Sequence, residues 1–309
     1  MTMQPKTLFV IGNGFDIAHG LPTRYKDFRD YLVQKYAVNE DEFYDIPVLH
    51  DGFDGPEYDE EEVAGFVCQV IDNCTGGNWA ALENYLGPAL IDELMSGAQI
   101  DFDGSDSDFE YSVKAYQCEA ENVSPAFSYL RDFFIMWLRE NLSQIDYSAL
   151  GKPEFKDVLS SGDAFLNFNY TKTLEMAYGL QNVCHIHGII DDPENALFGH
   201  NDEREYDEDI GAKERFTVSS SLDDMLCEFI KDTDQAYFQH KDFFDSLSSV
   251  TDIYSFGITM VGVDRSYAAK IAEKAPGATW HLNKRAMKKQ KLISFLESLG
   301  FKVVPEERW

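Results

Sequence analysis

The chain has few cysteines and no long apolar run, and each shortage excludes a class of protein. Its five cysteines are odd in number and include no Cys-x-x-Cys pair, so they indicate neither a disulfide framework nor a cysteine-based zinc ribbon. No stretch approaches about 18 uninterrupted apolar residues, and the N-terminus lacks the layout of a signal peptide. We therefore expect a cytoplasmic protein with reduced thiols, no membrane contact and no metal site.

Basic residues are also scarce, because 26 Lys and Arg stand against 55 Asp and Glu. The formal net charge of -29 repels a phosphate backbone, which argues against nucleic acid as a partner. Acidic residues concentrate in segments 38–62, 99–122 and 191–214, a pattern typical of solvated insertions. The one basic cluster, at 283–291, begins a helical pattern and predicts an exposed helix.

Short apolar runs alternate with helical patterns at both ends of the chain. The run Leu8–Ile11 leads through a glycine-rich turn into a helical spacing over 21–36. Five more apolar runs follow residue 163, separated by helical stretches: AFLNFNY, VCHIHGII, DIYSFGI, ATWHL and FKVVP. The alternation predicts an α/β fold with a Rossmann-like, mostly parallel sheet and helices on both of its faces.

The middle third has helical spacing instead. Residues 78–94 place their large apolar side chains on one helical face, and Glu83 lies near it. A second helix is expected over 124–142, with Ser124 as N-cap and Pro125 at the first helical position. Glu83 is a candidate lid residue over a ligand, against the alternative of a solvated or paired acid.

These patterns predict a division of the chain into two parts. Residues 1–37 and 151–309 would form the nucleotide-binding domain, and 38–150 an acidic, mainly helical insertion after the first β-α unit. With 44% hydrophobic residues the chain can bury a substantial core.

The first candidate site is the turn in LFVIGNGFDIAHG. Backbone N–H groups of Gly12, Asn13 and Gly14, backed by a helix N-terminus, can bind phosphate. Ile17 stands where the dinucleotide fingerprint has its third glycine, so an ordinary strand–turn–helix connection is the alternative. Asp16 is a candidate contact to a ribose or substrate hydroxyl, or a cap of the turn.

Polar residues also end two later apolar runs, where open α/β sheets bind ligands. Asn167 and Asn169 can each donate and accept hydrogen bonds, although turn residues have the same character. His185 and His187 end another run, and we expect only one of them to face a given side of the sheet. A histidine at a strand end is a candidate base or a structural residue.

The late segment FGITMVGVDRSY repeats the strand-then-glycine layout. Gly257 follows the apolar run, and Thr259 and Asp264 are candidate hydroxyl or amide contacts. Taken alone, the segment is equally consistent with a strand and a helix cap.

In this order, the motifs resemble the AbiH family of bacterial phage abortive-infection proteins. The resemblance covers nearly the whole chain outside the acidic segments and is carried by LFVIGNGFDIAHGLPTRYKDF, NWAALENYL, FLNFNYTKTLE, HIHG, FGHN and FGITMVGVDRSY. The family in turn looks distantly similar to sirtuin-like NAD-binding domains. On that comparison Gly12 and Gly14 match the Gly-x-Gly turn, Asn169 matches the asparagine, and His187-Gly188 match the His-Gly pair.

Two departures from that pattern bear on the activity. Asn167 stands in place of the usual threonine, and Thr171 where an aspartate often follows. The zinc module of sirtuin deacetylases, built on Cys-x-x-Cys pairs, is missing. The comparison therefore implies an NAD hydrolase of phage defence rather than a deacetylase.

The implied chemistry is hydrolysis of NAD, or a related nucleotide, at the nicotinamide N-glycosidic bond. Asn169 would orient water or ribose, neutral His187 would accept a proton, and the turn would hold the pyrophosphate. A nucleotide-sensing module without turnover and a nuclease-type toxin remain as alternatives, and homo-oligomerisation and a phage-derived trigger remain open. The candidate set is Asn169 and His187 for catalysis, with Gly12, Asn13, Gly14, Asp16, Gly188, Gly257, Thr259 and Asp264 for nucleotide binding.

Overall fold

Six parallel strands form the central sheet of the computed structural model, which describes residues 4–52, 55–98, 100–101, 104–200, 220–258, 260 and 262–308. The strands lie in the spatial order β5-β4-β1-β6-β7-β8. They are β1 (Thr7–Ile11), β4 (Ala164–Asn167), β5 (Val183–His185), β6 (Asp252–Phe256), β7 (Thr279–Asn283) and β8 (Lys302–Glu306). All five pairings are parallel, which confirms the predicted α/β class.

The strand order has a reversal that matters for ligand binding. Counted along the chain, the six strands lie in the order 3-2-1-4-5-6, and the direction of winding changes between β1 and β6. Doubly wound sheets bind their ligands outside the carboxyl ends of the strands at this switch point. The loops after β1 and β6 are therefore the place to look for a site.

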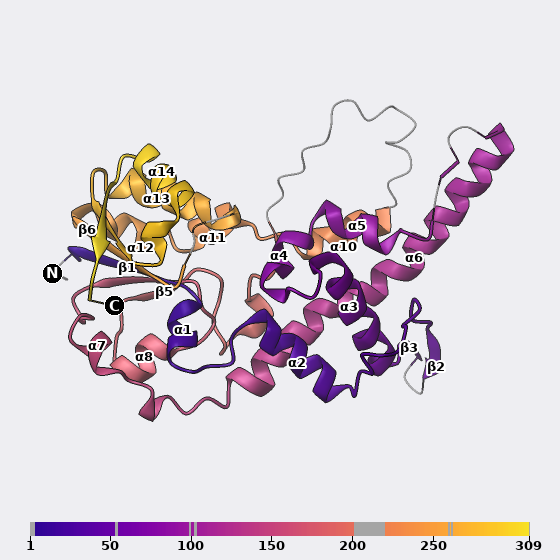
Figure 1. Cartoon of the computed structure of the whole chain (residues 1–309), viewed down its shortest axis with the longest axis horizontal. Helices are drawn as coiled ribbons and strands as arrows, with labels where there is room; N and C mark the ends of the chain where they lie inside the picture. Colours follow the sequence, from indigo (N-terminus) through magenta and orange to yellow (C-terminus); the bar gives the residue numbers. More distant parts are fainter. Residues whose placement is uncertain are drawn as a thin grey trace. The chain divides into compact units, whose positions relative to one another are not determined.

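Helices cover both faces of the sheet (Figure 1). Because side chains alternate along a strand, Leu8 and Val10 of β1 pack on one face, and Phe9 and Ile11 on the other. The first face is covered by α11 (Thr233–Gln239), α12 (Lys241–Asp245), α13 (Arg265–Lys274) and α14 (Gln290–Ser298). The second is covered by α1 (Gly14–Ala18), α7 (Pro153–Lys156) and α8 (Thr173–Tyr178).

The chain divides into two compact units. The sheet unit comprises Met1–Arg24, Leu138–Leu197 and Asp232–Trp309, and the helical unit comprises Tyr25–Trp137 and Phe198–Lys231. The sequence suggested one inserted segment, whereas the helical unit takes two separate stretches of chain. Aromatic packing explains the second stretch, because the ring of Phe198 stacks on that of Phe134 at 4.2 Å.

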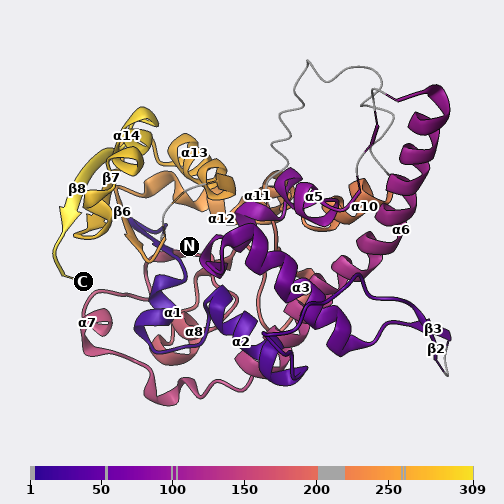
Figure 2. The same cartoon turned by 45° about the vertical axis from the view of Figure 1, so that its right-hand side comes forward.

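The helical unit is built along the long helix α6. Figures 1 and 2 show α2, α3 and α10 running beside it. Its elements are α2 (Tyr25–Lys35), the hairpin β2 (His50–Gly52) and β3 (Gly55–Glu57), α3 (Glu60–Thr75), α4 (Leu82–Tyr85), α5 (Pro88–Leu94), α6 (Asp106–Trp137) and α10 (Ser220–Glu228). Within the described ranges, no helix has both the length and the apolar character needed to cross a membrane.

Two expected helices of this unit differ in the structure. The N-cap predicted at Ser124 is wrong: α6 begins at Asp106 and continues through Pro125, and the Ser124 hydroxyl donates to the Ala120 carbonyl at 2.7 Å. Buried residues on both sides of the proline hold the helix together despite the backbone bond that proline cannot make. The helix expected over 78–94 is broken at Gly87, and α5 restarts with Pro88 at its first position.

Candidate functional site at the carboxyl ends of the strands

The turn after β1 packs directly on the loop after β6. The N–H of Gly12 donates to the Phe256 carbonyl at 2.9 Å, and that of Gly14 to the Gly257 carbonyl at 3.2 Å. A Cβ on Gly14 would lie 2.5 Å from the Gly257 Cα, and one on Gly12 would lie 2.7 Å from the Gly257 oxygen. The glycines therefore allow two backbones to meet, and both N–H groups are engaged within the protein.

The side chain of Asn13 also forms its hydrogen bonds within the protein, with Thr23. Its Nδ2 donates to the Thr23 carbonyl at 2.7 Å, and its Oδ1 accepts from the Thr23 hydroxyl at 2.5 Å. The amide thus ties the turn to the chain that follows α1. These bonds fix the conformation of the turn.

Asp16 is buried, with 1% of its surface exposed. Its carboxylate oxygens accept hydrogen bonds from the hydroxyls of Thr171 (2.5 Å) and Thr173 (2.8 Å). Burial raises the pKa of Asp16 to about 6, although the two hydroxyl bonds lower it. An aspartate in place of Thr171 would put a second carboxylate against Asp16, which accounts for the threonine at that position.

The raised pKa makes the stability of the protein depend on pH. Because the folded carboxyl holds its proton up to about pH 6, against 3.8 when unfolded, stability rises as pH falls through 6 and levels off below 3.8. We expect the parent to gain about 1 kcal/mol over Asp16→Asn between pH 7.5 and pH 5. Denaturant unfolding at both pH values measures the difference. In the control Asp157→Asn, which changes an exposed residue, the free energy of unfolding should change with pH as it does in the parent. If Asp16→Asn shows the same pH dependence as the parent, the Asp16 carboxyl is not buried with a raised pKa.

Asn169 joins the ends of two neighbouring strands. Its Nδ2 donates to the Gly12 carbonyl at 3.2 Å, and its N–H donates to Asn167 Oδ1 at 3.1 Å. Its carbonyl is 3.0 Å from Nδ1 of His185, whose Nε2 is 2.6 Å from Glu175 Oε1. Both ring nitrogens of His185 therefore lie within hydrogen-bond distance of an oxygen atom. Asn167 and His185 thereby fix the backbone around Asn169.

His187 lies on the side of the sheet that α13 covers, whereas His185 contacts Glu175 of α8 on the other side. Strand alternation does not set this difference, because β5 ends at His185 and His187 follows it. Its ring contacts Phe168 (centroids 5.1 Å apart) and Tyr267 (5.7 Å), and its Nε2 is 3.8 Å from Asp264 Oδ1. Only 4% of His187 is exposed. Phe168 directly precedes Asn169, so the structure brings Asn169, His187 and Asp264 to the carboxyl ends of β4 and β5.

Gly188 follows the histidine in a left-handed conformation, with φ at 92°. A Cβ there would lie 2.9 Å from the Ala196 Cα. Gly188 therefore allows residues 187–197 to fold back, as the bond from the Leu197 N–H to the His187 carbonyl at 2.8 Å shows. Thr259 lies outside the described residues.

Tyr267 was not found from the sequence, because its place on α13 looks like an ordinary core position. It is 0% exposed, and within the described ranges its hydroxyl has no hydrogen-bond partner. Burial, and then the charge of Asp264, raise its pKa well above the usual range. An unpaired buried hydroxyl costs about 1–3 kcal/mol, so a bound group that pairs with it would recover that cost.

The family model of the bacteriophage abortive infection protein AbiH matches residues 8–284. The chain belongs to the AbiH family. No match was found among curated proteins or among solved structures. The matched AbiH range includes every residue of the strand-end site described above, and it extends through the helical unit.

Two AbiH motifs meet inside the helical unit. Glu83 of NWAALENYL forms an ion pair with Lys231, with 2.5 Å between Oε1 and Nζ. His200 of FGHN forms an isolated parallel β-bridge with Ile230, and its N–H donates to the Phe229 carbonyl at 2.8 Å. Lys231 is buried, so Glu83 neutralises a charge that would otherwise be costly. Among the described residues, no group of His, Cys, Asp and Glu is arranged to hold a metal ion.

Proposed function

We propose that this AbiH chain is an abortive-infection effector that hydrolyses NAD, or a related nucleotide, at the nicotinamide N-glycosidic bond. The observation that carries the proposal is the His187–Asp264 pair, with Nε2 3.8 Å from Oδ1, where His187 also contacts Phe168, the residue before Asn169. The 3-2-1-4-5-6 strand order supports a nucleotide as the ligand. The similarity of Asn169 and His187-Gly188 to sirtuin-like domains supports the choice of NAD.

The bond to nicotinamide breaks through a cationic sugar, so the site needs a base and oriented polar groups rather than a strong nucleophile. His187 accepts a proton from a ribose hydroxyl or from the attacking water, and Asp264 stabilises the resulting imidazolium by its charge. Asn169 uses one amide hydrogen on Gly12. Its Oδ1 accepts from the ribose hydroxyl or the water and so orients it.

The pyrophosphate binds at the turn after β1 when that turn parts from the loop after β6. The bond that has to open is the one from Gly14 N–H to the Gly257 carbonyl, which at 3.2 Å is longer than the 2.9 Å bond of Gly12. The released N–H then donates to phosphate. Nucleotide binding therefore requires a local change in the contact between the two loops.

Incubation of the purified full chain with NAD tests the proposal directly. Chromatography of the mixture should show nicotinamide and ADP-ribose, formed in equal amounts over time. Calorimetry with NAD, ADP-ribose and AMP should show binding of the adenine nucleotides. The proposal fails if the chain neither releases nicotinamide nor binds any of the three.

A nucleotide-sensing module without turnover is the second candidate. The observation that favours it is the burial of His187, which leaves only 4% of the residue exposed to a substrate or water. Binding of NAD with no nicotinamide released, even at high protein concentration, would select this alternative.

Removing the Tyr267 hydroxyl should raise the stability of the unliganded protein and lower its affinity for nucleotide. Tyr267→Phe removes an unpaired buried hydroxyl, so we expect the unliganded protein to gain up to about 1 kcal/mol, while nucleotide binding weakens about five- to tenfold. Thermal unfolding with and without ADP-ribose measures both effects.

Tyr178→Phe is the matched control for this substitution. The Tyr178 hydroxyl accepts from the Lys152 N–H at 2.9 Å and lies 2.5 Å from His19 Nε2, so its removal should destabilise the protein by about 1–3 kcal/mol. If Tyr267→Phe destabilises the protein to the same degree, the Tyr267 hydroxyl has a structural partner and is not a ligand group.

A further inference from the structure

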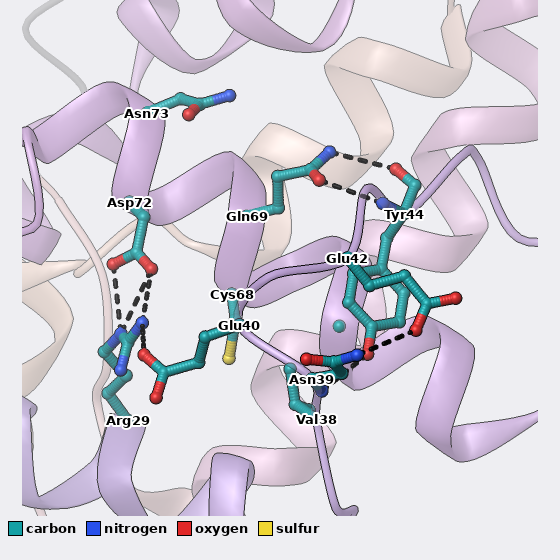
Figure 3. Close-up of a pocket in the computed structure, with 11 residues that line it drawn as sticks. Arg29, Val38, Asn39, Glu40, Glu42, Tyr44, Cys68, Gln69, Asp72 and Asn73 are labelled. Carbon is teal, nitrogen blue, oxygen red and sulfur yellow. Dashed lines mark hydrogen bonds and ion pairs between the residues drawn. The ribbon is translucent and has the colours of Figure 1, made fainter.

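The helical unit contains a pocket of about 220 Å³ that none of the sequence motifs indicated. It is formed by α2, α3 and the segment that follows α2, and it has room for about seven water molecules. Figure 3 shows Arg29, Asp72 and Glu40 at one side of the pocket, Asn39, Glu42 and Tyr44 at the other, and Cys68 between them.

The walls of this pocket are held in place before any ligand arrives. The Tyr44 N–H donates to Gln69 Oε1 and the Gln69 Nε2 donates to the Tyr44 carbonyl, both at 2.9 Å. The Tyr44 ring lies on Gly65, where any Cβ would overlap it. The Asn39 N–H also donates to the Tyr44 hydroxyl, at 2.8 Å. Three contacts thus fix the segment after α2 against α3.

One part of the pocket lining is apolar. Val38 and Cys68 line it there, and both are buried. Burial raises the pKa of the Cys68 thiol to about 12, so the sulfur is protonated and not nucleophilic at neutral pH. This part of the pocket fits an apolar stem of a ligand.

Arg29 does not make the pocket an anion site, because its charge is already neutralised. Its Nε donates to both Asp72 oxygens (3.0 and 3.1 Å), and its Nη2 donates to Asp72 (2.6 Å) and Glu40 (2.7 Å). Trp79 Nε1 also donates to Asp72, at 2.6 Å. Both carboxylate oxygens of Asp72 therefore already accept hydrogen bonds within the protein.

Glu40 and Glu42 remain to meet a ligand. Glu40 uses Oε2 on Arg29, and Glu42 accepts from Asn39 Nδ2 at 3.3 Å with its own Oε2. The Oε1 atoms of Glu40 and Glu42 accept no hydrogen bond from the described residues. One arginine against three carboxylates leaves the lining with two negative charges, which favours a cation.

We propose that this pocket binds an organic cation, an alkylammonium or alkylguanidinium group, whose stem contacts Val38 and Cys68 and whose charge is neutralised by Glu40 and Glu42. The group can belong to a free small amine or to a lysine or arginine side chain of a peptide. The proposal is independent of the strand-end chemistry, because every residue that carries it lies within the helical unit.

Calorimetry on the full chain at about 150 mM salt tests the pocket. Butylammonium and butylguanidinium are the free cations, and N-acetyl-lysine-N-methylamide and its arginine counterpart represent the peptide source. At this ionic strength attraction by distant exposed charges is screened, so binding reports the pocket. We expect saturable binding of a cation at one site per chain, and the arm that binds more tightly identifies the source.

Glu42→Gln should weaken that binding about five- to tenfold, because it removes a ligand carboxylate that makes no contact with Arg29. Glu110→Gln makes the same charge change on an exposed part of α6 and should bind like the parent. Equal affinities of parent and Glu42→Gln, equal losses in Glu42→Gln and Glu110→Gln, or no binding of any of the four cations would overturn the proposal.

Discussion

Replacing Gly257 with alanine is expected to destabilise the sheet unit by about 3 kcal/mol or more. The new Cβ would lie 2.5 Å from the Gly14 Cα, and the residue would have to keep a φ of 70°. The three atoms nearest to this Cβ all belong to the Gly14 backbone, so they cannot move aside as a flexible side chain would. Denaturant unfolding followed by tryptophan fluorescence, to which Trp280, buried in β7, contributes from the sheet unit, measures the loss.

Gly277→Ala separates the two causes. Gly277 has a similar φ of 74°, but a Cβ there meets nothing within 4 Å. Its loss should therefore be only the conformational cost, about 1 kcal/mol. If Gly257→Ala is no worse than Gly277→Ala, the β1 turn and the β6 loop are not in contact. A bulky residue at Gly14 should disrupt the same contact with Gly257 and destabilise the protein. This loss of stability would come in addition to any effect on phosphate binding.

His187→Ala is expected to reduce NAD cleavage by about 10² to 10⁴ while nucleotide binding remains measurable. The substitution removes the proposed base and leaves the turn after β1 intact. Asn169→Ala should lower turnover similarly, with some loss of binding because the amide also holds the ribose. Calorimetry with NAD beside a nicotinamide-release assay distinguishes the two effects.

His281→Ala provides the control for the histidine. His281 also faces a carboxylate, with Nε2 2.9 Å from Asp252 Oδ1, but it lies within β7 rather than at the site. Turnover by His281→Ala should match the parent. Cleavage by His187→Ala at the parental rate would refute the assigned role, whatever the fold.

The strands could be predicted from the sequence because each is a short apolar run. Each of the six predicted runs overlaps one strand of the sheet. The order β5-β4-β1-β6-β7-β8 could not be predicted, because it depends on pairing between residues far apart, such as Ile11 with Phe256. The start of the second helix of the middle third was predicted wrongly. Proline favours the first position of a helix, but Pro125 lies inside α6.

The candidate site was predictable only in part, for a related reason. His185 and His187 lie on opposite sides as expected, but not because of strand alternation, which puts residues two apart on the same face. The strand β5 ends at His185, and where it ends could not be predicted from the sequence. The reason for Gly12 and Gly14 was not visible, because their close neighbour is Gly257, far along the chain. Tyr267 was missed because the burial of its hydroxyl has no local sign in the sequence. The Arg29–Asp72 pair was missed because its two residues are 43 positions apart.

The central position of β1 in the sheet has a consequence for synthesis of the protein. Ile11 pairs with Asn167 on one side and with Phe256 on the other, so β1 obtains its second partner only after about 245 further residues have been synthesised. At 5–20 residues per second this delay is roughly 12 to 50 s. During that time Leu8–Ile11, which are buried in the folded chain, have at least one unpaired edge, and both edges are unpaired until β4 has been made. Nascent chains of this protein should therefore depend on chaperone binding near β1 until β6 has been made.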